Sequence, residues 1–492
     1  MAGLKKYDFW LAVAAALLVL LSVWQLEQQR AGITVKRIET GAGPVTLYHA
    51  GGRAVGPPVV VAHGFAGSTT LMQTISLDLA RAGFTVAAFD FHGHGRSRPL
   101  MSADITRIEG TTRQLVAQTA EVLDWLRGHT GLTGPAGFVG HSMATDVIIR
   151  AAENTPDASS IVAISMYSDA VTETAPGALL MISGAWEHRL RAVALGYLAQ
   201  TDPQAVEGQT VRRGDLMRRA VAAPGTEHLS VLFSTTTLRE TRDWLAATLG
   251  HTPDGRSVVT SPWILVLLVS LVMLLRPLSR VLPAGQIEGT PLNPGRYLGI
   301  QVAAGSAGFV AASFGAGSVA GIAAFQGLAV FLCVWGAVCL ALLYKSGRRF
   351  RAPSPAGTAL LLFWGLGVFA LALDRYGAAF VPVGPRLPLM AVLCLGTLPF
   401  MLADRMLHHN APLWQRITGR VAPVGVLALL MSTGTGQMGL LFTVLPVLLL
   451  FWLVYGTMGH WISRRAGPET AGIALGLCFA WAIAASTPLF AG

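Results

Sequence analysis

Cysteine and charge are both scarce in this 492-residue sequence. Its four cysteines, Cys333, Cys339, Cys394 and Cys478, all lie in apolar runs of the second half, and no C-x-x-C pair occurs. The first half therefore has no disulfide framework, and the common cysteine-based zinc sites are excluded. Only 13% of the residues are charged and 52% are hydrophobic, a composition too apolar for a soluble protein of this length. We expect a membrane protein.

The long apolar runs divide the chain into three parts. Two lysines precede the uncharged run Phe9–Leu26, which lacks a small-residue cleavage site. We interpret residues 1–29 as an uncleaved signal-anchor helix, with a cleaved signal as the alternative. Residues 30–255 are typical of a globular domain, and residues 256–492 predict a membrane domain of about eight more helices. The predicted spans are Ser261–Leu275, Gly295–Phe314, Val319–Tyr344, Pro355–Leu373, Leu387–Ala403, Val421–Met431, Gly439–Tyr455 and Thr470–Phe490.

The basic residues predict the orientation of these spans. With the N-terminus inside, most arginines and lysines fall in the inner loops, and the outer loops between the later spans hold only Arg375 and Arg386. This asymmetry is the positive-inside pattern. It predicts a multi-pass cell-membrane protein whose residues 30–255 lie outside the cytoplasm, on the periplasmic side in a bacterium. The net charge of +10 is then a topology signal, and its dispersal argues against a nucleic-acid partner.

The globular part is organised around Gly140-His141-Ser142-Met143-Ala144. An apolar strand-like run precedes this segment and a helix-compatible run follows it, which is typical of a nucleophile elbow that exposes a serine hydroxyl. Predicted strands and helices alternate on both sides of it. The sequence therefore predicts an α/β fold with a mostly parallel sheet and helices on both faces, joined to an all-α transmembrane bundle.

Two further motifs precede the elbow. His63-Gly64-Phe65 ends a buried strand, and Asp90 to Ser97 reads D-F-H-G-H-G-R-S. In this order the three motifs resemble the serine esterase and lipase type of the α/β-hydrolase superfamily, over roughly Ile33–Leu249. The resemblance implies that Ser142 is the nucleophile and that the backbone N–H groups of Phe65 and Met143 form the oxyanion hole. Ala144 departs from the usual glycine. We expect the histidines of the first two motifs, His63, His92 and His94, to be structural.

In this family the acid and then the histidine follow the serine along the chain. Glu187 comes three residues after the glycine that ends the predicted strand Ala178–Ser183, so the resemblance implies that it is the acid. Asp169 and Glu173 are rival acids after the preceding strand. His228 lies in a loop between the last predicted strand and the last helix, and the resemblance implies that it is the base.

These roles predict a membrane-anchored serine hydrolase that cleaves a carboxylic ester, a small molecule or a lipid, through an acyl-enzyme and without a cofactor or a metal. An acyltransferase or thioesterase with the same triad is the first alternative. A non-catalytic hydrolase-like binding module on a transport or assembly protein is the second, and the complete ordered triad disfavours it. The short link before Ala178 leaves no room for a helical lid. The lipid bilayer is the expected partner, and the sequence identifies no protein partner.

Overall fold

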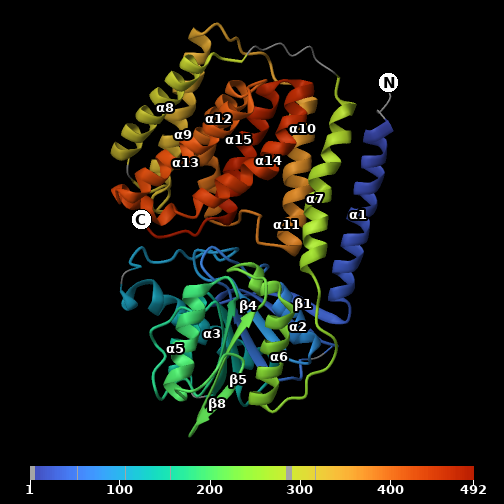
Figure 1. Ribbon diagram of the computed structural model, residues 1–492, viewed down its shortest axis with the longest axis vertical. Coiled ribbons are helices and arrows are strands. Elements are labelled where there is room, and N and C mark those ends of the chain that lie inside the picture. The colour runs from blue at the N-terminus through green and yellow to red at the C-terminus, as the bar shows by residue number, and fades with distance from the viewer. Residues whose placement is uncertain (1–5, 53, 106, 156, 284–290, 316) are drawn as a thin grey trace. The chain divides into compact units, whose positions relative to one another are not determined.

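The computed structural model of the chain describes residues 6–52, 54–105, 107–155, 157–283, 291–315 and 317–492 (Figure 1). It divides into two compact units. The sheet unit comprises Val23–Ile264 with Tyr376–Ala379, and the helical unit comprises Met1–Ser22, Leu265–Arg375 and Phe380–Gly492. The N-terminal helix α1, Lys6–Arg30, contributes to both units. Lys5, one of the two lysines before the predicted anchor, lies outside the described residues.

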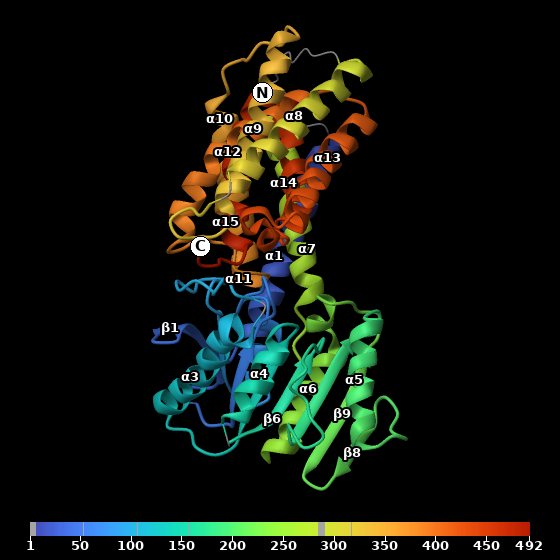
Figure 2. The ribbon, with the colours of Figure 1, turned by 90° about the vertical axis from the view of Figure 1, so that its left-hand side faces the viewer.

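The sheet unit is built on one nine-stranded sheet in the order β1-β2-β4-β3-β5-β6-β7-β9-β8. Six neighbouring strands run parallel to one another, namely β4, β3, β5, β6, β7 and β9. Strands β1, β2 and β8 are antiparallel to their neighbours. Figure 2 shows β9 next to β8 at one edge. The predicted α/β class is confirmed. The strands are β1 (Ile33–Thr40), β2 (Gly43–Ala50), β3 (Pro58–Ala62), β4 (Thr85–Phe89), β5 (Ala136–His141), β6 (Ala158–Ile164), β7 (Ala178–Gly184), β8 (Thr210–Arg213) and β9 (Leu216–Ala223).

Apolar residues form the central strands because both faces of the sheet are covered. Strands β3, β4 and β5 are buried along their whole length, as expected of parallel strands between two helical layers. Val59 and Val61 of β3 share a core with Ile75 of α2 and with Leu238 and Leu245 of α6. The helices of this unit are α2 (Gln73–Arg81), α3 (Arg113–Thr130), α4 (Ala144–Glu153), α5 (His188–Thr201) and α6 (Thr235–Leu249).

Both edges of the sheet are antiparallel strands with exposed basic residues. Lys36 and Arg37 are exposed on β1, and Arg212 and Arg213 are exposed on β8. Strand β8 is not predicted from the sequence, because Thr-Val-Arg-Arg has one buried residue and no apolar alternation.

The link between β6 and β7, residues 165–177, contains no helix or strand. It is held by Arg218 of β9, a fully buried side chain that donates hydrogen bonds to the carbonyl oxygens of Thr172 and Ala175. The predicted short connection is therefore a loop without a lid helix. Its buried carbonyl groups accept hydrogen bonds from an arginine side chain, where those of a helix would accept them from the helix's own N–H groups.

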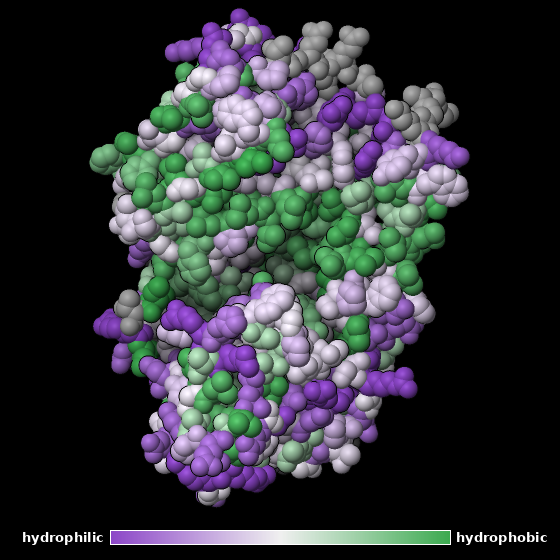
Figure 3. Space-filling view, in the orientation of Figure 1, coloured by the Kyte–Doolittle hydropathy of each residue, from purple (hydrophilic) through white to green (hydrophobic). Residues whose placement is uncertain are grey.

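The helical unit consists of long apolar helices. Figure 3 shows a broad apolar surface over this unit, with hydrophilic residues toward its upper end. Such a surface suits a hydrocarbon environment. The helices after α1 are α7 (Ser261–Leu278), α8 (Pro294–Phe314), α9 (Phe325–Lys345), α10 (Pro355–Leu362), α11 (Ala370–Tyr376), α12 (Arg386–Leu407), α13 (Leu413–Ser432), α14 (Val444–Ala466) and α15 (Pro468–Ser486), and a π-helical turn, Phe363–Phe369, joins α10 to α11.

Eight helices among the described residues are long and apolar enough to cross a membrane by length and composition. These eight helices include α1, and each of them overlaps one of the predicted spans. One predicted span has no counterpart among them. The predicted span Val421–Met431 lies in α13, which is not among the eight, whereas about nine spans are predicted from the sequence. Helix α13 carries Arg416 and Arg420 within its first half, so its apolar part is short.

Candidate active site

Ser142 lies in a tight turn between β5 and α4. Its φ angle is 53°, in the left-handed region that non-glycine residues rarely adopt. Gly140 and Ala144 are the close-packed positions of this turn: a Cβ on Gly140 would lie 2.8 Å from Ile148 Cδ1 and 2.9 Å from the Ala144 carbonyl oxygen. Position 144 itself accommodates a buried methyl group. The departure from G-x-S-x-G is therefore at the position that has room for it.

Three predicted site residues from three separate loops meet at this turn. His228 Nε2 lies 2.9 Å from Ser142 Oγ, and His228 Nδ1 lies 2.6 Å from Glu187 Oε1. The Glu187 side chain is 7% exposed and that of His228 is 44% exposed. The structure thus places a hydroxyl, an imidazole and a buried carboxylate in one hydrogen-bonded chain.

The loops that carry the acid and the histidine are packed against each other. Gly184 ends β7, and a Cβ there would lie 2.6 Å from the Thr226 carbonyl oxygen. The Trp186 N–H donates to that same oxygen at 3.1 Å. Only glycine allows this approach, so the contact at the ends of β7 and β9 sets the distance between Glu187 and His228.

Residues 57–232 match the family described as the alpha/beta hydrolase fold. The sheet unit is an α/β-hydrolase domain. Among solved structures, an epoxide hydrolase from an endophytic Streptomyces aligns with 16% identity and a TM-score of 0.32, covering 45% of this chain and 97% of its own. A dienelactone hydrolase from Anabaena variabilis aligns with 19% identity and a TM-score of 0.31, covering 44% of this chain and 99% of its own. No curated protein matches the chain.

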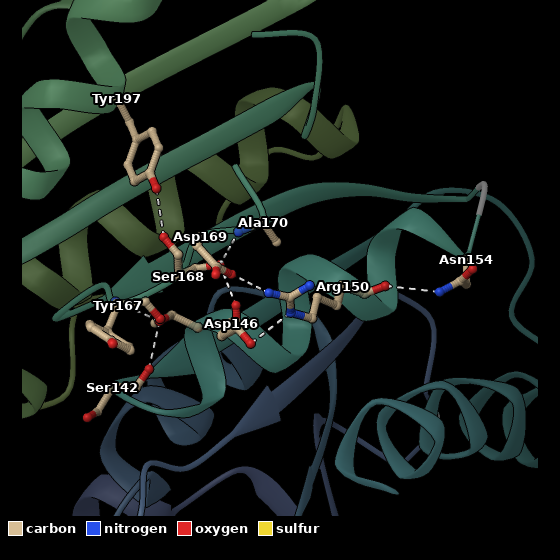
Figure 4. Close-up of polar contacts among 10 residues, drawn as sticks. Ser142, Asp146, Arg150, Asn154, Tyr167, Ser168, Asp169, Ala170 and Tyr197 are labelled. Carbon is tan, nitrogen blue, oxygen red and sulfur yellow. Dashed lines mark hydrogen bonds and ion pairs between the residues drawn. The ribbon is translucent and has the colours of Figure 1, made fainter. Parts of the chain in front are cut away.

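The rival acids of the hydrolase domain lie elsewhere. Asp169 forms an ion pair with Arg150 of α4, and its side chain is 86% exposed (Figure 4). Arg150 also binds Asp146 at 2.8 Å. Glu173 lies 4.0 Å from Arg213 at the sheet edge. Neither carboxylate contacts His228, so geometry favours Glu187 over both.

Hydrogen bonds hold Glu187 ionised. Burial raises the pKa of its carboxyl, but hydrogen bonds from His228, Ser165 and the Gly184 N–H outweigh burial and leave the pKa below its usual value. Ser165 Oγ donates to Glu187 Oε2 at 2.7 Å and the Gly184 N–H donates to the same oxygen at 2.6 Å. Oε1 is left for His228. The carboxylate therefore carries its negative charge at neutral pH, next to the imidazole.

His141 and Ser165 support this site, and neither is predicted from the sequence to do so. His141 is 2% exposed, and its Nε2–H donates to the His228 carbonyl oxygen at 2.8 Å. Burial, together with the neighbouring His228, lowers the pKa of His141 to about 4, so the ring is neutral at pH 7. Ser165 directly follows β6, and its place at the carboxyl end of a central strand is the one signal that could have found it.

The predicted oxyanion donors lie beside the serine. A Cβ on Gly64 would lie 2.9 Å from His141 Nδ1 and 3.0 Å from Ser142 Cβ, so the turn that contains Phe65 touches the elbow. Met143 directly precedes α4, and the first N–H groups of a helix have no acceptor within it. Both backbone positions are therefore next to Ser142.

His63 fixes that turn and is neutral. Its Nε2 accepts a hydrogen bond from the Phe91 N–H at 3.1 Å, so Nδ1 carries the proton and donates to the Gly64 carbonyl oxygen at 2.7 Å. Burial lowers the pKa of His63, which keeps the ring uncharged. His63 thus joins the turn after β3 to the segment after β4.

The Asp90 motif is likewise held by backbone contacts. Asp90 accepts hydrogen bonds from the N–H and the hydroxyl of Thr69, both at 2.7 Å, and from the Arg96 N–H at 2.8 Å. Gly95 has a φ of +47°, and a Cβ there would lie 2.4 Å from the Asp90 carboxyl group. His94 Nδ1 bonds to the His92 carbonyl oxygen. Across the described part of the chain, no group of three or more His, Cys, Asp or Glu residues could hold a metal ion.

Proposed function

We propose that the protein is a membrane-anchored serine hydrolase that cleaves a carboxylic ester through Ser142, His228 and Glu187. The observation that carries the proposal is the continuous pair of contacts at one imidazole, 2.9 Å from Ser142 Oγ to Nε2 and 2.6 Å from Nδ1 to Glu187 Oε1. Each atom has the hydrogen-bonding capacity that its role needs. An arrangement serving only as a helix cap would not need a buried carboxylate behind the imidazole.

In the acylation step His228 Nε2 takes the Ser142 proton while Oγ attacks the ester carbonyl carbon. The carbonyl π electrons move to oxygen, and the backbone N–H groups of Phe65 and Met143 receive the oxyanion. Glu187 stabilises the imidazolium that forms. The tetrahedral intermediate then collapses, the bond to the alkoxide breaks, and His228 gives the proton to the leaving alcohol.

Deacylation repeats these steps with water. His228 Nε2 takes a proton from water, whose oxygen attacks the acyl carbon, and the proton returns to Ser142 Oγ as the carboxylic acid leaves. An alcohol or thiol acceptor in place of water would give acyl transfer by the same chemistry.

Exposed apolar side chains favour an apolar acyl group. Trp186 precedes Glu187 and is 65% exposed, Leu229 follows His228 and is 54% exposed, and Tyr167 lies just beyond Ser165 and is 71% exposed. Large exposed apolar residues beside a candidate site are typical of recognition surfaces. With the helix-free link between β6 and β7, they support a long-chain or lipid ester as substrate, on the extracytoplasmic side that the basic residues predict.

The test is labelling of the full-length detergent-solubilised protein with a fluorophosphonate probe. Wild type should be labelled, and Ser142→Ala and His228→Ala should abolish labelling. His188→Ala is the matched control, because His188 is an exposed histidine next to the acid and outside the hydrogen-bonded chain; it should be labelled like wild type. Failure of folded wild type to react would refute the proposal.

Esters of increasing chain length then define the substrate class. Rates for p-nitrophenyl acetate, octanoate and palmitate in the same detergent should rise with acyl length if Trp186, Leu229 and Tyr167 contact the chain. Substitution of Trp186 by Ala should reduce kcat/KM for the octanoate more than for the acetate. Equal loss for both esters would contradict a role in acyl-chain binding.

A further inference from the structure

The helical unit contains a pocket of about 830 Å³. This volume is in the range of small-molecule sites in proteins. Its walls come from four places: the start of α8, the link between α9 and α10, the end of α12, and the turn between α14 and α15. All of its lining residues belong to the helical unit.

Positive charge dominates the lining. Five arginines, Arg296, Arg348, Arg349, Arg351 and Arg465, face one carboxylate, Glu469. Glu469 is buried, and its Oε1 accepts a hydrogen bond from the backbone N–H of Arg351 at 3.1 Å. That carboxylate, at the start of α15, is therefore engaged with the backbone of the link between α9 and α10.

Three of these arginines have unused binding capacity. Within the described part of the chain, no carboxylate lies at ion-pair distance from Arg296, Arg349 or Arg465. Arg465 donates to the Arg280 carbonyl oxygen at 3.3 Å, and the Arg349 guanidinium lies 4.6 Å from the centre of the Tyr344 ring. A guanidinium has five N–H donors, so most of them remain available to a ligand.

Three helix N-termini open onto the same pocket. The capping residues Asn293 of α8, Ser354 of α10 and Gly467 of α15 all line it (helices labelled in Figure 1). Helices α8 and α15 are 21 and 19 residues long. The N-terminus of a helix carries partial positive charge and directs backbone N–H groups outward, which favours an anion. The arginine side chains and the helix N-termini therefore both contribute positive electrostatic potential to the pocket.

We propose that this pocket binds a phosphate-bearing ligand, either a soluble phosphate ester or the headgroup of an anionic lipid. Arginine forks match phosphate oxygens in pairs, and several guanidinium groups together with helix N-termini neutralise the negative charge of a phosphate group. Arginines at the ends of membrane helices also follow the positive-inside rule. That rule accounts for their side of the membrane, but it does not require five of them to converge on one concave site.

The test uses full-length protein and two probes, inorganic phosphate in neutral detergent, and mixed micelles containing phosphatidylglycerol or only phosphatidylcholine. Binding is followed by calorimetry for phosphate and by native mass spectrometry for lipid. The matched pair is Arg465→Gln and Arg464→Gln, because Arg464 is the exposed neighbour outside the pocket. Arg465→Gln should weaken binding by at least 10-fold, and Arg464→Gln should leave it within about 2-fold of wild type.

Each result decides the proposal. Phosphate binding in detergent identifies a soluble ligand, and retention of phosphatidylglycerol alone identifies a lipid headgroup. If Arg465→Gln is misfolded by size-exclusion chromatography, Arg465→Lys, Arg296→Gln and Arg349→Gln test the same walls. Binding of neither probe by wild type overturns the proposal. So does equal weakening by Arg464→Gln and the pocket variants, since that would indicate diffuse surface charge.

Discussion

Gly64→Ala tests whether the turn after β3 positions an oxyanion donor. The added methyl carbon would lie 2.9 Å from His141 Nδ1, 3.0 Å from the His141 carbonyl oxygen and 3.0 Å from Ser142 Cβ, several tenths of an ångström closer than ordinary van der Waals contact. Two of these atoms are fixed by the elbow backbone. The turn that bears Phe65 must therefore move away from Ser142.

The size of the effect follows from that displacement. A misplacement on the order of 1 Å at a reacting group costs about 100-fold in rate. Complete loss of one oxyanion donor costs about 10²–10³-fold in turnover. We expect kcat for an ester to fall by between about 10-fold and 1,000-fold while KM changes by less than about 3-fold, because the donor acts on the transition state. Overpacking should also destabilise the hydrolase domain by about 1–3 kcal/mol.

The assay is steady-state hydrolysis of a p-nitrophenyl ester together with a thermal unfolding scan of the full-length protein. Gly128→Ala is the control, since Gly128 is exposed in α3 and a Cβ there meets nothing within 4 Å. It should retain full activity. A folded Gly64→Ala protein with wild-type kcat would refute the assignment of this turn to the oxyanion hole.

Three further experiments test the remaining parts of the site. Glu187→Gln should slow fluorophosphonate labelling roughly 10³–10⁴-fold, whereas Asp169→Asn should leave it unchanged; the reverse would exchange their roles. Ser165→Ala removes a donor to the carboxylate and should lower kcat about 10-fold with little change in KM, and an unchanged kcat would limit Ser165 to packing. The folded-state pKa of His141, about 4, is below its unfolded value of 6.5, so lowering the pH through this window should remove about 3 kcal/mol of stability. Urea unfolding of His141→Gln should lack that pH dependence, and an identical slope in both proteins would contradict the buried neutral ring.

The elements around the serine were predictable because local pattern and chain order determine them. A buried apolar run followed by Gly-x-Ser-x-Ala indicates the turn, and the resemblance to the α/β hydrolases implies Glu187 and His228 from their places after successive strands. His228 lies between β9 and α6, in the loop between the last strand and the last helix of the domain that the sequence predicts.

The remaining contacts depend on how separate loops meet. Glu187 contacts His228, whereas Asp169 pairs with Arg150 of another element, and the sequence shows neither contact. The hydrogen bond from Ser165 to Glu187 and that from His141 to His228 join residues 22 and 87 positions apart. No periodicity or local motif in the sequence indicates contacts between residues so far apart along the chain. They follow from the register of the sheet, which the sequence specifies only through the packing of the whole domain.

The charged edge strands have a consequence under the proposed attachment of the domain to a membrane. Attachment confines copies to two dimensions and raises the frequency with which their sheets meet. A bare antiparallel edge in that setting would template pairing with the next copy. If the β1 strands of two copies approached each other, Lys36 and Arg37 of one copy would lie opposite the same basic residues of the other. Pairing of two β8 strands would do the same with Arg212 and Arg213. In the proposed membrane-attached state, like-charge repulsion at both edges would therefore oppose the joining of neighbouring sheets into one continuous sheet.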